Sequence, residues 1–326
     1  MTESDLKQKI LLFFRKNKEQ YVSGEDISRS LEVSRAYVWK YMSKLRDDGY
    51  AIDAVPRLGY KIRSVPDKLF GYEIKNGLKT RVIGKKEIYH YEAIDSTNNR
   101  AYELAEELAP EGTIVVAESQ THGKGRIGRK WVSPKNGGIY MSLILRPDVE
   151  TDEVPSVTLV AAVAIIRAIK DITGIDVRMK WPNDILCGKK KVCGILTEIK
   201  AQPDRVDFLI LGAGINVNTP VGKLPAGSTS LKDETGYSIN RAQLMRQILE
   251  ELENNYKKFQ KKGFTIVRSE CKRLSSVLGK NVRIKAHHHI IEGKAIDIDK
   301  KGALIVWDGN CERRRVFSGD VSVVSQ

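Results

Sequence analysis

The sequence has little cysteine and no long hydrophobic run. Four of its 326 residues are cysteine, and none of the four belongs to a C-x-x-C pair. This usage fits reduced thiols in the cytoplasm better than a disulfide framework. The longest apolar stretch, residues 157–166, is too short to span a bilayer, and the first ten residues show no signal-peptide pattern. We therefore expect a cytoplasmic protein without a membrane partner.

Acidic residues are outnumbered by basic ones. The chain has 41 Asp and Glu against 55 Lys and Arg, a net charge of +14. Such an excess indicates a polyanionic partner, either a nucleotide or a nucleic acid. With 41% hydrophobic and 29% charged residues, the chain has the composition of an ordinary globular protein. Its length suggests two or three domains.

A Rossmann turn is absent, although residues 123–131, GKGRIGRKW, contain the spacing G-x-G-x-x-G. That turn needs a strand directly before it and a helix after it. Here SQTH separates the strand GTIVVAE from the loop, and the strand GIYMSLIL follows. What remains is a glycine-rich loop with four cations: Lys124, Arg126, Arg129 and Lys130. By spacing alone, it is either an anion-binding loop or an exposed basic loop without a ligand.

Residues 1–65 have the pattern of a winged helix-turn-helix domain. Three short helices are predicted, the second opened by Ser23 and the third by Ser34, followed by two strands joined by the turn PRLG. The third helix, residues 35–49, would enter a DNA major groove. The fold is also used for protein contacts, but cations crowd this helix and the wing tip. The predicted DNA-binding residues are Ser34, Arg35, Tyr37, Lys40, Lys44 and Arg57. Tyr41 is expected on the same exposed face.

The rest of the chain divides by its strand pattern. Residues 66–270 alternate strands and helices with short turns, which predicts an α+β domain with a mixed sheet. Residues 271–326 are alternating strands with tight turns expected at Glu292-Gly293 and Lys301-Gly302, which predicts a small β-barrel. Three consecutive histidines, residues 287–289, suggest a metal site, but only two would share one face of a strand, among cations. We expect no metal site built from protein side chains alone.

Polar residues follow several strands of the middle part. In IDSTNNRA, Ser96, Thr97 and Asn98 stand where a helix starts. One hydroxyl would cap that helix, and another could bind a small polar ligand.

Three later stretches add further polar groups. KWPNDI holds Asn183 and Asp184 on a proline-bearing turn, and GKKKVCGILTEI carries Lys191 directly into an apolar strand. GAGIN ends another strand with Asn216, and its glycines permit close approach of a ligand to the backbone.

Together these stretches resemble the bifunctional biotin–protein ligases that also repress the biotin operon. The ordered set is DSTN, QTHGKGRIGRKW, KWPND, KKVCGI and GAGIN. The resemblance covers essentially the whole chain, whereas lipoate–protein ligases share the middle fold but lack the N-terminal domain. It implies a winged helix-turn-helix (1–65), a catalytic domain of the biotin/lipoate ligase type (66–270) and an SH3-like β-barrel (271–326).

The resemblance also implies a two-step reaction. ATP and biotin, with Mg²⁺, give biotinyl-5′-adenylate and pyrophosphate, and a lysine of a biotin carboxyl carrier protein then attacks the adenylate. Attack of a carboxylate on a phosphate brings like charges together, which cations and backbone N–H groups must offset. The glycine-rich loop is interpreted as the part that closes over the adenylate. We also expect an adenylate-dependent homodimer that binds palindromic operator DNA.

Individual roles follow from the same resemblance. Catalysis is assigned to Lys191, Arg126 and Asp184. Biotin binding is assigned to Ser96, Thr97, Asn98, Gln120, Gly123, Lys124, Gly125, Arg126, Lys191 and Gly194. Nucleotide binding is assigned to Arg126, Arg129, Trp131, Asn183 and Asn216, the two asparagines also being placed for Mg²⁺. The sequence departs from the family where Lys124 replaces an arginine and where Ser228 stands near an adenine-stacking tryptophan.

Two other functions remain as alternatives. One is a ligand-sensing transcription factor without catalytic activity, against which the intact loop and Lys191 argue. The other is ligation of lipoate or octanoate, which the N-terminal domain and the C-terminal barrel disfavour.

Overall fold

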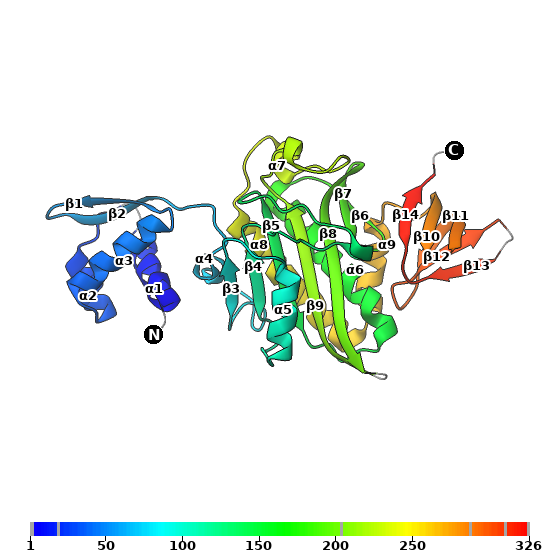
Figure 1. Cartoon of the computed structure of the whole chain (residues 1–326), viewed down its shortest axis with the longest axis horizontal. Helices are drawn as coiled ribbons and strands as arrows, with labels where there is room; N and C mark the ends of the chain where they lie inside the picture. The colour runs from blue at the N-terminus through cyan, green and yellow to red at the C-terminus, as the bar shows by residue number, and fades with distance from the viewer. Residues whose placement is uncertain (1–2, 18–19, 203–204, 287–288, 310–311, 325–326) are drawn as a thin grey trace. The chain divides into compact units, whose positions relative to one another are not determined.

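A computed structural model of the chain describes residues 3–17, 20–202, 205–286, 289–309 and 312–324 (Figure 1). Contacts divide it into two compact units, Met1–Gly77 and Leu78–Gln326. None of the described helices is both long and apolar enough to cross a membrane.

The first unit is a winged helix-turn-helix, as predicted. Its elements are α1 (Glu3–Lys16), α2 (Gly24–Leu31), α3 (Arg35–Asp47), β1 (Ala51–Val55), β2 (Gly59–Ser64) and α4 (Gly71–Lys75). The predicted caps are confirmed: the Ser23 hydroxyl accepts from the N–H of Glu25, and the Ser34 hydroxyl from that of Tyr37. Strands β1 and β2 pair as an antiparallel hairpin, which forms the wing.

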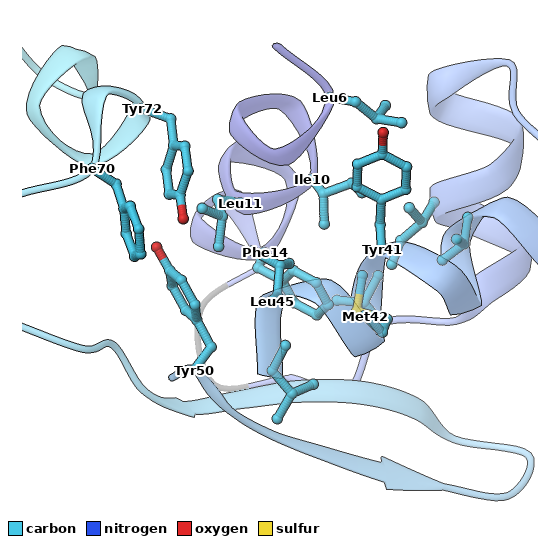
Figure 2. Packing of buried hydrophobic residues seen from close by; sticks show 14 residues of the cluster. Leu6, Ile10, Leu11, Phe14, Tyr41, Met42, Leu45, Tyr50, Phe70 and Tyr72 are labelled. Carbon is cyan, nitrogen blue, oxygen red and sulfur yellow. The ribbon is translucent and has the colours of Figure 1, made fainter. Parts of the chain in front are cut away.

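One hydrophobic core holds this unit together (Figure 2). Its buried members are Leu6, Ile10, Leu11, Phe14, Val22, Ile27, Val38, Tyr41, Met42, Leu45, Tyr50, Ile52, Phe70 and Tyr72. The expected exposure of Tyr41 is wrong, since its side chain is only 4% exposed. Tyr41 lies three residues after Val38 and four before Leu45, a spacing that puts all three on one helix face.

Helix α4 is tied to this core by buried polar contacts. The Tyr50 hydroxyl donates to the Glu73 carboxylate, which also accepts from Arg15 at 2.5 Å. The Tyr72 hydroxyl donates to Asp48 at 3.0 Å. Burial, with the nearby acidic groups, raises the pKa of both tyrosines far above the ordinary value. Figure 2 shows Phe70 and Tyr72 grouped with Tyr50 beside Leu11.

The second unit is built on a mixed sheet, as predicted. Its strand order is β3-β4-β5-β9-β8-β7-β6, in which β3 and β4 are parallel and the other pairs antiparallel. The strands are β3 (Ile88–Tyr91), β4 (Ile114–Ala117), β5 (Gly138–Leu145), β6 (Val177–Lys180), β7 (Asp184–Cys187), β8 (Lys190–Gln202) and β9 (Arg205–Asn216). Strand β5 follows the glycine-rich loop directly, so the rejection of a Rossmann turn is confirmed.

Helices pack against this sheet. They are α5 (Thr97–Glu106), α6 (Val154–Thr173), α7 (Leu231–Thr235), α8 (Arg241–Lys262) and α9 (Thr265–Leu274), with short 3₁₀ turns at Arg126–Gly128, Thr151–Glu153 and Val221–Lys223. Helix α5 contacts β4, β5 and β9, whereas α6 contacts β6, β7 and β8 and packs on α8 and α9. The apolar run at 157–166 lies inside α6 and is buried, as expected.

The C-terminal part is a five-stranded antiparallel sheet. It comprises β10 (Asn281–Ala286), β11 (His289–Ile298), β12 (Leu304–Asp308), β13 (Arg313–Val316) and β14 (Asp320–Val323), in the order β13-β12-β11-β10-β14. A β-rich part is thus confirmed. The SH3-like barrel stays a prediction, because within the described residues this row of strands does not close.

One of the two predicted turns is present. The Lys301-Gly302 turn is confirmed, with the N–H of Gly302 donating to the Asp299 carbonyl. The Glu292-Gly293 turn is wrong, because both residues lie inside β11. Gly293 is needed there for close packing, since a Cβ would stand 2.2 Å from the Trp307 carbonyl oxygen. Of the three histidines, 287 and 288 lie outside the described residues, and His289 is exposed at the start of β11.

Glu253 of α8 anchors the chain just before the sheet. Its carboxylate is buried and accepts from the N–H groups of Arg81, Val82 and Ile83 at 2.7–2.9 Å. Burial alone would raise the pKa of Glu253. The hydrogen bonds from Lys257 and the three backbone donors outweigh that effect and lower it from 4.5 to about 2.

A neutral side chain at this position is expected to destabilise the second unit. Because the folded pKa lies below the unfolded one, the stabilisation is complete above pH 4.5 and is lost as the pH falls through about 2. Glu253→Gln should therefore lower the free energy of unfolding by about 3 kcal/mol at pH 7, and by less at pH 3. Urea unfolding at both values measures this. Glu250→Gln is the control, because Glu250 accepts one N–H bond, from Lys79; equal effects of the two changes would contradict the prediction.

Candidate active site

A pocket lies over β5, β8 and β9 beside the start of α5. The loop 118–137, which joins β4 to β5 and is called the glycine loop below, covers it. The pocket is lined by Ser96, Thr97, Asn98, Gln120, Lys124, Gly125, Arg126, Trp131, Met141, Asn183, Lys191, Gly194, Ile195, Leu196, Gly212, Ala213 and Gly214. Eleven of these lining residues are among those predicted from the sequence to bind biotin or nucleotide or to take part in catalysis.

Four of the residues that were predicted to bind ligand or to take part in catalysis do not line this pocket. Gly123 lies behind the pocket wall, where its carbonyl accepts from the N–H of Trp131 at 2.8 Å. Arg129 pairs with Asp320 at the edge of the C-terminal sheet. Asn216 and Asp184 lie next to lining residues and are described below.

The floor of the pocket is a network of neutral polar groups. The Gln120 side-chain carbonyl accepts from the N–H and the hydroxyl of Thr97, at 2.8 and 3.1 Å. The Ser142 hydroxyl oxygen lies 2.8 Å from the Thr97 hydroxyl and 2.5 Å from the Asn98 side-chain oxygen, and its single proton can be donated to one of them at a time. Ser96 occupies the N-cap position of α5, as predicted, but its side chain makes no capping bond. The network fixes these groups before any ligand binds.

Trp131 and Lys191 form one wall. The Lys191 ammonium lies 5.3 Å from the centre of the Trp131 ring and 2.6 Å from the Asp184 carboxylate. A cation over an aromatic face is stabilised by the ring quadrupole. Trp131 packs on Gly214, where a Cβ would stand 2.4 Å from the indole. The glycine of GAGIN is therefore needed for the approach of Trp131.

The backbone around Lys191 is also fixed. Its N–H donates to the carbonyl of Gly227 at 2.8 Å, and its carbonyl accepts from the N–H of Thr229 at 2.9 Å. Ser228 therefore lies directly beside Lys191. Asn216 is buried nearby, with its amide donating to the Thr229 carbonyl at 3.0 Å.

Each of three loop cations contacts an acceptor of the protein. Lys124 pairs with Glu198 at 3.1 Å, and Arg129 pairs with Asp320. Arg126 donates to the Asn183 side chain at 3.1 Å and to the Gly319 carbonyl at 3.3 Å. Burial lowers the pKa of Arg126. Because each of the three has its own partner, their mutual repulsion is partly offset.

Two carboxylates among these partners, Glu198 and Asp320, are not among the residues predicted from the sequence. Glu198 joins the pocket floor to the loop, because it accepts from Asn98 at 2.6 Å as well as from Lys124. A period of two along β8 from Gly194 and Leu196 would have placed it on the pocket face. Asp320 has no such local signal.

Three buried polar atoms at the site lack a hydrogen-bond partner among the described residues. One of them, Oδ1 of Asp184, is paired with the Lys191 ammonium. The other two, the Trp131 indole nitrogen and the Asn216 side-chain oxygen, have no such ion pair. Because burying an unpaired polar group is costly, such atoms indicate positions where a ligand can bond. The described part of the chain contains no group of three His, Cys, Asp or Glu that could hold a metal.

The thiols near the site are poor nucleophiles. Burial raises the pKa of Cys193, two residues from Lys191, well above its usual range. Burial and the nearby Glu234 raise the pKa of Cys187 to about 11. Since the thiolate is the reactive form, neither cysteine suits covalent catalysis at neutral pH.

In the first unit, the predicted DNA-binding residues are mostly accessible. Ser34, Arg35, Tyr37, Lys40 and Arg57 are exposed, while Lys44 is half-buried with its ammonium 5.3 Å from the Tyr41 ring. Trp39, which is not among the predicted DNA-binding residues, is 65% exposed on the same helix.

Comparisons with known proteins extend over the whole chain. Residues 91–216 match the Biotin/lipoate A/B protein ligase family, residues 7–61 an HTH domain, and residues 277–324 the Biotin protein ligase C terminal domain. The bifunctional ligase/repressor BirA of Bacillus subtilis is 40% identical over 98% of this chain and 99% of its own. That of Escherichia coli is 28% identical over 88% of each.

A solved structure supports the same relationship. The biotin protein ligase of Aquifex aeolicus, in complex with biotin and ATP, is 31% identical. It matches with a TM-score of 0.64, covering 74% of this chain and 100% of that one.

Proposed function

Because the chain belongs to the family of bifunctional biotin–protein ligases and repressors, we propose that it activates biotin with ATP, transfers biotin to a lysine of a carrier protein, and represses transcription in response to biotin. The observation that carries the ligase function is the pocket itself. It combines a neutral polar floor, a half-buried cation at Lys191 and a loop that carries further cations. We also propose that the chain has three domains, namely a DNA-binding domain (1–65), a catalytic domain (66–270) and a C-terminal domain (271–326).

In the first step, a biotin carboxylate oxygen attacks the α-phosphorus of ATP and pyrophosphate leaves. Thr97, Asn98 and Gln120 suit the uncharged polar part of biotin, because they offer fixed donors and acceptors. Lys191 and Arg126 would balance the charge that gathers between carboxylate and phosphate. The remaining assigned biotin residues are Ser96, Gly123, Lys124, Gly125 and Gly194.

In the second step, the carrier lysine amine attacks the acyl carbon of the adenylate, AMP leaves, and the amine loses a proton. Asp184 holds the Lys191 ammonium at 2.6 Å and is proposed to orient it and to accept that proton. Trp131 supplies an apolar wall, with Arg129 and Asn216 on the nucleotide side. Mg²⁺ would screen the phosphates, and the unpaired side-chain oxygen of Asn216 is an oxygen donor of the kind that Mg²⁺ accepts.

Exchange of labelled pyrophosphate into ATP tests this proposal. It should depend on biotin and not on lipoate. Exchange with lipoate instead would favour a lipoate ligase, and biotin binding without any exchange would favour a ligand-sensing repressor. Transfer to a carrier domain tests the second step.

For repression, we propose that α3 enters the major groove and that adenylate favours a homodimer on palindromic DNA. The exposed cations of α3 and the wing support this. Operator affinity that does not change with biotin and ATP would contradict the coupling to adenylate.

Lys40→Ala is expected to weaken binding to DNA of any sequence and to reduce the slope of log affinity against log salt by about 1, since a phosphate contact releases about one counterion. Fluorescence anisotropy over a salt series measures this. Lys258→Ala, which removes one exposed charge from α8, is the control; the same change of slope in both variants would contradict a contact by Lys40.

A further inference from the structure

Both ends of the glycine loop converge on one buried arginine. Arg241, the first residue of α8, is 0% exposed. Its guanidinium donates to the Glu118 carboxylate at 2.8 Å and to the Gly138 carbonyl at 2.9 Å. Glu118 is the first residue of the loop, and Gly138 directly follows its last. One side chain therefore joins the two ends.

Further bonds fix each end to the sheet. Glu118 is also 0% exposed, and its carboxylate lies 3.1 Å from the ring nitrogen of His90 on β3. The backbone carbonyl of Glu118 accepts from the backbone N–H of Asn136 within the loop. At the other end, the N–H of Asn218 donates to the Gly137 carbonyl at 2.6 Å. The base of the loop is thus bound to β3, to the segment after β9, and to α8.

This arrangement is costly for stability alone. An arginine at the start of a helix opposes the positive end of the helix dipole, and burying an ion pair rarely stabilises more than well-packed apolar residues would. Helix α8 already has a cap, because the Asn240 side chain accepts from the N–H of Gln243. The position of Arg241 is therefore better explained by what it connects than by the helix it begins.

The tip of the loop is held differently. Lys124 and Arg129 are 40% and 66% exposed in their pairs with Glu198 and Asp320. Exposed pairs are weak and can exchange partners. The loop therefore has a rigid base and a tip whose cations can transfer from protein acceptors to a ligand.

We propose that Arg241 is a positioning residue for adenylate formation. By holding Glu118 and Gly138 together, it fixes the points from which Lys124, Arg126 and Arg129 reach the nucleotide. This rests on the proposed function of the loop. Strands β4 and β5 stay paired up to Ala117 and Tyr140. Without Arg241, however, the Glu118 carboxylate and the Gly138 carbonyl lose the donor that they share, so the base of the loop loosens, the cations lose their register with the phosphates, and the loop opens.

Arg241→Met and Arg241→Lys test this in the full-length protein. Both bonds come from one nitrogen, Nη1. Lysine keeps the charge and one nitrogen but lacks the planar guanidinium that sets the direction of these bonds, so it should restore them only in part. The loop contains four trypsin sites, at Lys124, Arg126, Arg129 and Lys130, and its cleavage without ligand reports opening. Biotin-dependent exchange at varied ATP gives KM and kcat.

In Arg241→Met we expect trypsin to cut the loop at least tenfold faster. The KM for ATP should rise and kcat/KM should fall about 100-fold, as small displacements of catalytic groups do. Arg241→Lys should recover part of both. Arg167→Met is the control, because it breaks the pair with Glu251 and Glu270 on distant helices; it should leave loop cleavage and KM unchanged at equal or greater loss of thermal stability.

Unchanged cleavage and KM in Arg241→Met would overturn the inference, as would equal changes in the Arg167 control. Failure of the proposed function is recognised separately, because the unsubstituted protein would then show no biotin-dependent exchange. Should Arg241→Met not fold, Glu118→Gln removes the charge of the partner while keeping its shape, and the same cleavage and KM outcomes decide.

Discussion

Replacing Lys191 by alanine should lower the rate of biotin-dependent pyrophosphate exchange by about 100- to 1,000-fold, the usual effect of removing a group that stabilises charge in a transition state. Its ammonium stands over Trp131 and beside Asp184, and its backbone is bonded on both sides to the segment 227–229. No movement of the chain is needed to bring the charge to the pocket. The loss should therefore fall mainly on kcat.

Lys189→Ala is the matched control for this experiment. Lys189 lies two residues earlier in an exposed turn, so the same change of charge should leave exchange within about twofold, as for surface substitutions in general. Thermal unfolding of both variants checks that the fold is retained. An exchange rate in Lys191→Ala within threefold of that in Lys189→Ala would exclude Lys191 from the chemistry.

Arg126→Ala is expected to have the second large effect, a fall of about 100-fold in kcat/KM for ATP. Among the three loop cations with partners it is the least exposed, and it lines the pocket from a half-buried position, where electrostatic interactions are stronger than at the surface. Arg126→Lys should lose less, because the charge remains although the bidentate geometry does not. Steady-state exchange at varied ATP measures both.

Arg129→Ala provides the comparison, since Arg129 is 66% exposed and pairs with Asp320 at the surface. We expect a loss of less than tenfold. If the two alanine variants lost activity equally, the loop would act through its total charge, and the particular position of Arg126 would have no significance.

Short motifs at strand ends could be predicted from the sequence, and distant contacts could not. Thr97, Gln120 and Lys191 lie together because each follows or begins a strand of one sheet, and strand ends are visible as patterns. Asp320 meets Arg129 across 191 residues, and Arg241 meets Glu118 across 123, which no local period reveals.

Local sequence patterns also gave wrong predictions at two positions where the packing of neighbouring residues determines the structure. The sequence pattern places Tyr41 on the exposed face with the cations of α3, whereas its side chain is the fourth on the buried face of that helix, beside Val38, Met42 and Leu45. The glycine at 293 predicts a turn, whereas Gly293 lies inside β11, where only a residue without a Cβ allows the backbone of Trp307 to approach.

The contacts of α4 determine where the N-terminal domain can be excised. A fragment ending at residue 65 keeps Tyr50 and Arg15 but lacks Glu73, the acceptor that both share. It also lacks Phe70 and Tyr72, which cover one side of the core. Buried polar groups left without partners and an uncovered apolar face are the usual causes of an insoluble fragment. A fragment prepared for DNA-binding or crystallographic work should therefore extend to Gly77.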